Sequence, residues 1–214
     1  MSDSQLFDPD CRACPRLATF LDQVKADYPD YYARPVPPFG VADPALLIVG
    51  LAPGMHGANA TGRPFTGDHA GILLYETLYQ YGFSTAAESL SSDDGLKLID
   101  CRITNAVKCL PPQNKPVGAE INTCNTYLTH ELYSLYEGSI VLALGSIAHN
   151  SVIKALGLRQ KSHPFGHNRL HEFDNGLRLL DSYHCSRYNT QTRRLTTEMF
   201  QAVFARARDL IDAG

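Results

Sequence analysis

The amino-acid sequence predicts a three-layer α/β/α sandwich with a central, mainly parallel sheet. Apolar runs within residues 45–51, 97–107 and 139–145 alternate with segments whose apolar residues recur at helical spacing. Continuous apolar runs are typical of parallel strands buried on both faces, and the alternation of strand and helix is typical of α/β folds. At 214 residues with 44% hydrophobic residues, the chain fits a single domain, residues 1–214, with a sizeable core.

The first half of the chain supplies two strands and two helices. Residues 12–27 have the apolar spacing of a helix, whereas RPVPPFG at 34–40 is too rich in proline for a helix or a sheet interior and predicts an extended arm. ALLIVGL at 45–51 predicts a buried strand, and the next helix is expected over 69–82. The segment 97–107 contains the second strand.

The second half continues the alternation and ends in a hairpin and a long helix. The pattern predicts a helix over 118–136, a buried strand over 139–145 and a helix from there to about residue 157. An Asn-Gly pair between 169–173 and 177–183 indicates a hairpin. The last helix is expected over 191–212, with Asn189 or Thr190 as its N-cap.

Composition excludes several classes of protein. No run of about 18 apolar residues is present, so we expect no membrane span, and the acidic start MSDSQLFDPD lacks the apolar core of a secretion signal. We therefore expect a cytoplasmic protein. The net charge is −3, but residues 150–214 carry ten Lys and Arg against six Asp and Glu. A duplex-binding face in the last third is one explanation, and an ordinary uneven surface is the other.

Four cysteines have a spacing that suits a metal site. Cys11 and Cys14 form a C-x2-C pair, and Cys109 and Cys124 are brought in by a later loop and helix start. Four thiolates suit a [4Fe-4S] cluster or Zn²⁺. A redox dithiol is the rival explanation, but this C-x2-C precedes any strand instead of lying at a strand-to-helix turn.

The remaining cysteines carry less signal. Cys101 lies within a strand and is expected in the core, where free cysteine is commonly buried. Cys185 neighbours His184 in a polar loop, where it is either a reactive thiol or, the interpretation that we favour, a bystander.

Functional residues are expected where the strands end, because ligands of parallel sheets bind at the carboxyl ends of strands. The loop VGLAPGMHGANATGRPFTGD, residues 49–68, is rich in glycine but contains neither a P-loop nor a dinucleotide fingerprint. Its Phe65 either stacks on a flat ligand or anchors the loop to the core. Its Asp68 falls where a helix begins, so it is a candidate N-cap, a catalytic acid, or both.

Two further strand ends carry polar side chains. Asn105 can offer a donor and an acceptor to a base edge, although a loop asparagine often bonds its own backbone. His184 follows the last strand and can donate a hydrogen bond to developing negative charge. The loop behind it contains Arg187, Tyr188 and Asn189, which suits phosphate contact and insertion into a base stack.

Together these segments resemble the uracil-DNA glycosylase superfamily, and in particular its iron–sulfur family 5. The matching motifs are GLAPG…GANATGRPFTGD (50–68), ITNAVKCLPPQNKP (103–116), VLALGSIAH (141–149) and SYHCSRYNTQTRRLT (182–196). With the cysteines, the resemblance spans about residues 11–212. Family 4 has a polar residue in GEAPG where this chain has the apolar Leu51, as family 5 does.

The resemblance implies a set of site residues. Asp68, Asn105 and His184 are the implied catalytic residues, and the implied ligands of a [4Fe-4S] cluster, or less favourably of Zn²⁺, are Cys11, Cys14, Cys109 and Cys124. The implied base contacts are Gly50, Ala52, Gly54, Phe65 and Asn105, and the implied DNA contacts are Ser186, Arg187, Tyr188 and Asn189. Two departures stand out: the family usually has proline at Cys185 and glycine at Arg193.

The implied activity is that of a monofunctional DNA glycosylase in base excision repair. It would flip uracil, and other deaminated bases such as hypoxanthine or xanthine, out of double-stranded DNA and hydrolyse the N-glycosidic bond. We expect a monomer associated with the nucleoid. Three alternatives are a non-catalytic iron–sulfur or zinc nucleic-acid-binding protein, a redox protein, and a family 4-like enzyme restricted to uracil.

Overall fold

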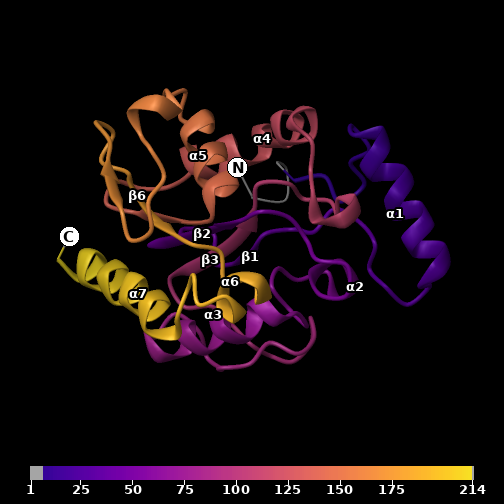
Figure 1. Ribbon diagram of the computed structural model, residues 1–214, viewed down its shortest axis with the longest axis horizontal. Helices are drawn as coiled ribbons and strands as arrows, with labels where there is room; N and C mark the ends of the chain where they lie inside the picture. Colours follow the sequence, from indigo (N-terminus) through magenta and orange to yellow (C-terminus); the bar gives the residue numbers. More distant parts are fainter. Residues whose placement is uncertain (1–6, 214) are drawn as a thin grey trace.

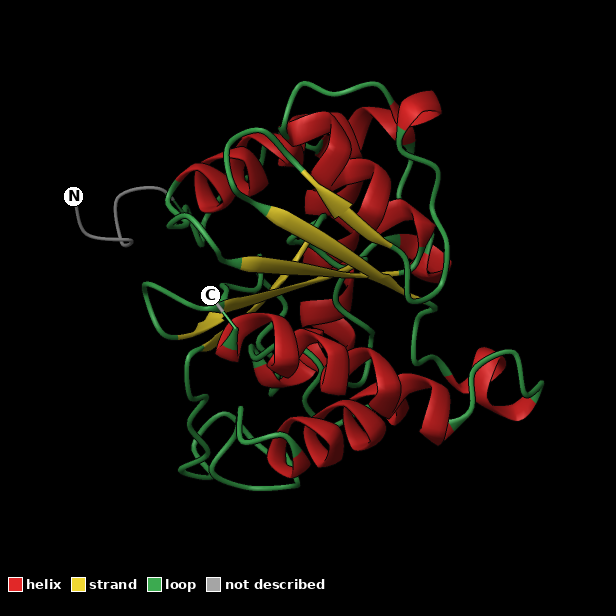
Figure 2. Ribbon diagram, turned by 90° about the vertical axis from the view of Figure 1, so that its left-hand side faces the viewer, coloured by secondary structure: helices red, strands yellow, loops and turns green. Residues whose placement is uncertain are grey.

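The computed structural model describes residues 7–213 and has three layers (Figure 1). A six-stranded sheet forms the middle layer, with the strand order β1-β3-β2-β4-β6-β5. Helices lie above and below it in the side view of Figure 2. The strands are β1 (Phe39–Gly40), β2 (Leu46–Gly50), β3 (Cys101–Asn105), β4 (Ile140–Leu144), β5 (Leu170–Glu172) and β6 (Arg178–Ser182). The predicted fold class is confirmed.

The centre of the sheet is parallel, and both of its edges are antiparallel. Strands β3, β2, β4 and β6 run parallel, whereas β1 pairs antiparallel with β3 and β5 antiparallel with β6. The register places Gly50 beside Asn105 at the carboxyl end of the sheet. The loops that follow the four parallel strands therefore all lie at the carboxyl end of the sheet.

Alternate residues of the strands bury two apolar faces. Leu46 and Ile48 of β2 face one core, which α3 (His69–Gln80) and α7 (Thr197–Asp212) cover. Leu47 and Val49 face the other core, beneath α4 (Gly118–Tyr133) and α5 (Ser146–Ala155). Figure 1 shows the two helix pairs on opposite sides of the sheet.

The first helix lies at one end of the molecule, apart from these two cores (Figure 1). This helix, α1 (Pro15–Asp27), buries Leu17 against Val107 and Cys124, and Leu21 and Val24 against Leu110. The N-terminal segment is thereby packed on the loop that follows β3. Among the described residues, no helix has the length and apolar character needed to cross a membrane.

The prediction for the last helix was wrong at its start. The expected helix over 191–212 is divided into α6 (Arg187–Gln191) and α7, and the N-caps are Ser186 and Thr196 instead of Asn189 or Thr190. Arg193 interrupts the helical path with a left-handed φ of 56°. Helical propensity on both sides of the break concealed it in the sequence.

Smaller elements were also missed or misplaced. The proline-rich arm contributes the short edge strand β1, and the glycine-rich loop contains a helical turn, α2 (Ala58–Thr61). Two 3-10 turns, Pro112–Asn114 and Gln160–Ser162, lie in the loops before α4 and after α5. The expected hairpin is present as β5 and β6. The acidic start, for which no secretion signal is expected, lies partly outside the described residues.

Candidate active site

A cavity of about 740 Å³ opens at the carboxyl ends of the parallel strands. Asp68, Asn105 and His184, which the sequence indicates as catalytic residues, all line it, and so does Phe65. Phe65 and Asp68 come from the loop after β2, Asn105 is the last residue of β3, and His184 follows β6. Leu144 and Gly145, at the end of β4, also line the cavity. The parallel sheet therefore brings together side chains that are up to 119 residues apart in the chain (Phe65 to His184).

Asn105 lies at the base of the cavity with an unpaired carboxamide. Its side chain is 2% exposed, and neither Nδ2 nor Oδ1 has a hydrogen-bond partner within the described chain. A buried polar group without a partner costs roughly 1–3 kcal/mol, so such a group calls for a ligand. The backbone alternative weighed for Asn105 does not account for this carboxamide, because it bonds no backbone atom.

Phe65 and His184 lie against each other across the cavity wall. Their ring centroids are 5.9 Å apart and their planes differ by 29°. Burial lowers the pKa of His184 to about 4, which keeps the imidazole neutral at neutral pH. Its Nδ1 atom is buried without a partner. A neutral imidazole has one N–H donor and one acceptor nitrogen, so its tautomer decides which of the two Nδ1 offers.

Asp68 caps α3 and still presents a carboxylate oxygen toward the glycine-rich turn. Its Oδ1 accepts a hydrogen bond of 2.8 Å from the backbone N–H of Gly71. A Cβ atom on Gly54 would lie 3.6 Å from the other oxygen, Oδ2. Burial raises the pKa of Asp68, and the N–H groups of Gly71 and Ala70 oppose that shift. The N-cap prediction is confirmed, and the cap leaves one oxygen for chemistry.

Three glycines make room for these side chains, and the sequence singled out only one of them. A Cβ atom on Gly57 would lie 2.6 Å from Cβ of Asp68, and one on Gly71 would lie 1.9 Å from the carbonyl oxygen of Phe65. Gly50 is not among the residues that line the cavity, but a Cβ atom there would approach Oδ1 of Asn105 to 2.4 Å. Of the other implied base contacts, Ala52 and Gly54 line the cavity itself.

Arg63 anchors the glycine-rich loop through its buried guanidinium, a role that was not predicted from the sequence. Its guanidinium is buried, pairs with Asp94 at 2.5 Å, and donates to Ser89 at 2.6 Å and to Thr66 at 2.9 Å. Phe65 is held between these anchors with a left-handed φ of 53°. Its ring also belongs to the core, so it both anchors the loop and forms the cavity wall.

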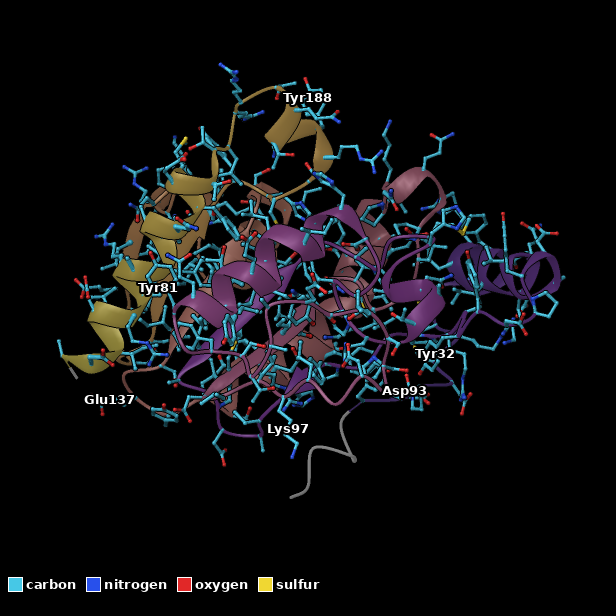
Figure 3. All side chains as sticks on the ribbon, turned by 90° about the horizontal axis from the view of Figure 1, so that it is seen from below. Tyr32, Tyr81, Asp93, Lys97, Glu137 and Tyr188 are labelled. Carbon is cyan, nitrogen blue, oxygen red and sulfur yellow. The ribbon has the colours of Figure 1, made fainter. Side chains whose placement is uncertain are left out.

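The residues after His184 form a rim at which only some side chains are free. Arg187 is exposed and Tyr188 is 70% exposed, and Figure 3 shows Tyr188 at the edge of the molecule on α6. Ser186 caps α6 through the N–H of Asn189, and Asn189 donates from Nδ2 to the carbonyl of His184 at 2.8 Å. Ser186 and Asn189 therefore shape the rim, while Arg187 and Tyr188 project from it.

Cys185 is fully buried behind the site. Burial raises the pKa of its thiol, and the nearby Asp68 charge adds to that shift. A protonated, inaccessible thiol is unreactive, which agrees with its interpretation as a bystander. Cys101 is likewise buried in the core, as expected.

The four cysteines implied as ligands surround a second cavity of about 330 Å³. They are Cys11, Cys14, Cys109 and Cys124, and all are free thiols. Burial and the charges of the neighbouring cysteines raise the pKa of Cys109 to about 12. Four thiols that repel one another as thiolates are the expected donors for a bound cation, because the cation compensates their charge.

A group of His149, His171 and Asp181 has its ligand atoms within 4.8 Å of one another. Nδ1 of His149 lies 2.7 Å from Oδ1 of Asp181, and Nε2 of His149 donates to the carbonyl of His163 at 2.8 Å. Nitrogen and oxygen ligands of a tetrahedral ion would be roughly 3.3 Å apart. The shorter distance is that of a hydrogen bond, so His149 and Asp181 form a buried hydrogen-bonded pair.

The chain is similar to known proteins of one family. A family model described as the uracil DNA glycosylase superfamily matches residues 37–208. The chain is 46% identical over 205 residues to the type-5 uracil-DNA glycosylase of Thermus thermophilus, an alignment that covers 94% of this chain and 93% of that protein. It is 43% identical over 210 residues to the type-5 uracil-DNA glycosylase of Mycobacterium leprae, covering 94% and 91%. A type-4 uracil-DNA glycosylase of Pyrobaculum aerophilum is 34% identical over 130 residues, covering 60% and 58%.

Proposed function

The chain belongs to the uracil-DNA glycosylase superfamily and to its type-5 branch, and we propose that it excises uracil from DNA by hydrolysing the N-glycosidic bond. The observation that carries this proposal is the buried, unpaired carboxamide of Asn105 in a cavity shared with Phe65, Asp68 and His184. A carboxamide matches the alternating donors and acceptors of a base edge.

Recognition of the base begins with its removal from the duplex, because the glycosidic bond is inaccessible inside the base stack. The flipped base stacks on Phe65, and Asn105 and the backbone of Ala52 and Gly54 meet its edge. Arg187 and Tyr188 project from the rim and fill the space that the base leaves.

Bond cleavage leaves an electron pair on the base and a positive, oxocarbenium-like sugar. The neutral imidazole of His184 donates a hydrogen bond to the departing base anion, which disperses its charge. The free oxygen of Asp68 orients the attacking water or offsets the charge of the sugar. The oxygen of the water bonds to C1′ of the sugar, the water releases a proton, and the base anion takes up a proton from solvent. The products are the free base and an abasic site.

The proposed enzyme is monofunctional. Among the described residues, no lysine lines the cavity, and the nearby Lys108 is buried, where its ammonium pairs with Glu131 at 2.7 Å and bonds Thr104. An amine held in this way is not available to form a Schiff base with the sugar. Strand cleavage therefore requires a later chemical or enzymatic step.

A [4Fe-4S] cluster held by Cys11, Cys14, Cys109 and Cys124 is the second part of the proposal. These cysteines line one cavity of about 330 Å³, which has room for a polynuclear cluster, and four thiolates are the usual ligands of such a cluster. Such a cluster supplies a structural crosslink from α1 to α4.

The breadth of the substrate range is the third part. The cavity of about 740 Å³ exceeds what a pyrimidine fills, and Leu51 at its wall offers no polar selection. Hypoxanthine and xanthine are therefore proposed as further substrates, with double-stranded DNA as the preferred partner.

The test is a strand-cleavage assay on duplexes that carry a single uracil or a single hypoxanthine. Cleavage only after hot alkali is the expected result, since alkali cuts abasic sites. Asp68→Ala and His184→Ala should each reduce excision by a hundredfold or more, as loss of one charge-stabilising group does. Binding of uracil DNA without base release, by protein with an intact metal site, would favour the nucleic-acid-binding alternative instead.

A further inference from the structure

A hydrogen bond joins the helix that follows the proposed catalytic acid to the rim helix. Nε2 of His69 lies 3.1 Å from Oγ1 of Thr190, although the two residues are 121 positions apart in the chain. His69 is the first residue of α3, directly after Asp68, and its side chain lines the active-site cavity. Thr190 lies in α6, two residues after the exposed Tyr188.

The direction of this hydrogen bond follows from the other contacts of the threonine. Oγ1 of Thr190 lies 3.2 Å from the carbonyl oxygen of Ser186 and 3.1 Å from that of Arg187, and both oxygens only accept. The hydroxyl proton is therefore used within α6, and the hydroxyl oxygen accepts from N–H of His69. The hydrogen bond from His69 to Thr190 therefore fixes the start of α3 relative to α6.

The position of the Asp68 carboxylate depends on the position of the first turn of α3. Its Oδ1 is tied to the N–H of Gly71 in the same helical turn that His69 begins. Phe65 and His184 also stack across the same junction. A shift of α6 relative to α3 would therefore change the distance from Asp68 and Phe65 to His184.

We propose that His69 is a positioning residue that couples insertion of α6 into the duplex to the alignment of Asp68. This inference rests on the proposed function. When Tyr188 and Arg187 enter the base stack, the contact from Thr190 to His69 holds α6 against α3 and keeps the acid aligned. A uracil that is already unpaired requires no insertion, so its excision does not depend on this contact.

The test compares two substrates with the same sequence: a duplex with a paired uracil and a duplex with the uracil in an unpaired bubble. Thr190→Val should lower single-turnover excision of paired uracil roughly tenfold, the effect of one lost hydrogen bond, and change the bubble rate less than about twofold. His69→Ala should lower the ratio of the paired rate to the bubble rate by the same factor. The double variant should be no slower than either single variant. Thr190→Ser should restore the wild-type ratio.

Thr192→Val is the matched control, because the hydroxyl of Thr192 bonds within α6 to the carbonyl of Tyr188 at 2.8 Å. It should leave the ratio of paired to bubble rates unchanged. Equal losses on both substrates, or losses that multiply in the double variant, would overturn the coupling. Absence of uracil excision by the wild-type protein would instead overturn the proposed function, so the two failures are distinguishable.

Discussion

A Cβ atom on Gly57 would lie 2.6 Å from Cβ and 2.7 Å from Oδ2 of Asp68. The carboxylate can occupy its position at the start of α3 only because residue 57 has no side chain. The glycine-rich loop therefore has two functions in the site: it exposes backbone to a ligand and it leaves room for the acid.

Replacement of this glycine should displace the acid without removing it. In Gly57→Ala the new methyl group forces Asp68 or the loop to move, and misplacement of a reacting group by about 1 Å costs roughly a hundredfold in rate. We expect kcat for uracil excision to fall by about that factor. Gly118→Ala is the control, since a Cβ atom there would meet nothing within 4 Å. Wild-type kcat in Gly57→Ala would contradict the placement of Asp68 at the reacting centre.

The rate of excision should fall on the acidic side of the pH profile, and the pKa of Asp68 should determine the pH at which it falls. Burial raises the pKa of Asp68 above its ordinary value, and the reaction requires the carboxylate, so kcat/KM should fall as pH decreases through that raised pKa. His184 has a pKa of about 4 and is neutral over the working range. His184→Asn should thus lower the rate at every pH while the limb stays in place. A limb near pH 6.5 that disappears in His184→Asn would show that the imidazole titrates in the reaction.

Metal content separates the two candidate occupants of the cysteine site. Purified protein should contain about four iron atoms per chain, whereas a zinc site would hold about one ion. Cys109→Ser should lower both the iron content and the melting temperature, because α1 and α4 lose their shared crosslink. Cys101→Ser alters a cysteine outside the site and serves as the control for iron content. One zinc ion per chain, lost in Cys109→Ser, would replace the cluster proposal.

The buried pair of His149 and Asp181 predicts how stability varies with pH. Burial disfavours the charged imidazole, but the hydrogen bond and charge of Asp181 outweigh this, so the pKa of His149 in the folded protein is raised. A raised histidine pKa stabilises the folded state fully below the unfolded value of about 6.5 and loses that contribution as pH rises through the folded value. The free energy of unfolding should therefore decrease with pH above about 6.5.

Urea unfolding across this pH range measures the contribution. His149→Gln removes one partner of a buried pair and should cost about 3 kcal/mol at pH 6, with a smaller cost at higher pH. His130→Gln, at an exposed position of α4, should retain the wild-type dependence. A constant cost of His149→Gln at all pH values would mean that the imidazole is neutral in the folded protein.

The sequence was most informative where periodicity and residue type determine structure locally. The strand that ends at Gly50 and the strand that ends at Asn105 were predicted from their apolar runs, and parallel pairing placed both ends at one edge. Asp68 was recognisable as a cap because acidic residues are favoured at that position. These features depend on a few neighbouring residues, so they remain readable without the fold.

Contacts between distant segments were not readable in the same way. Arg63 and Asp94 pair across 31 residues, and His69 meets Thr190 across 121, with no periodic signal to connect them. Gly57 had a local signal in the density of glycine around it, although its role depends on where Asp68 arrives. The break at Arg193 was concealed because left-handed backbone at a non-glycine residue is uncommon.

In the proposed enzyme, the loop after β3 would link base recognition to iron supply. Only three residues lie between Asn105 and Cys109. Among them, the N–H groups of Ala106 and Val107 bond to the carbonyls of Gly50 and Leu51 at 2.9 and 3.0 Å. With a cluster bound, the cysteine end of this segment is clamped and the asparagine end is held against the glycine-rich turn. Iron starvation, or oxidants that dismantle the cluster, would release one end of the segment, so the cell would lose uracil repair while the protein was still being synthesised.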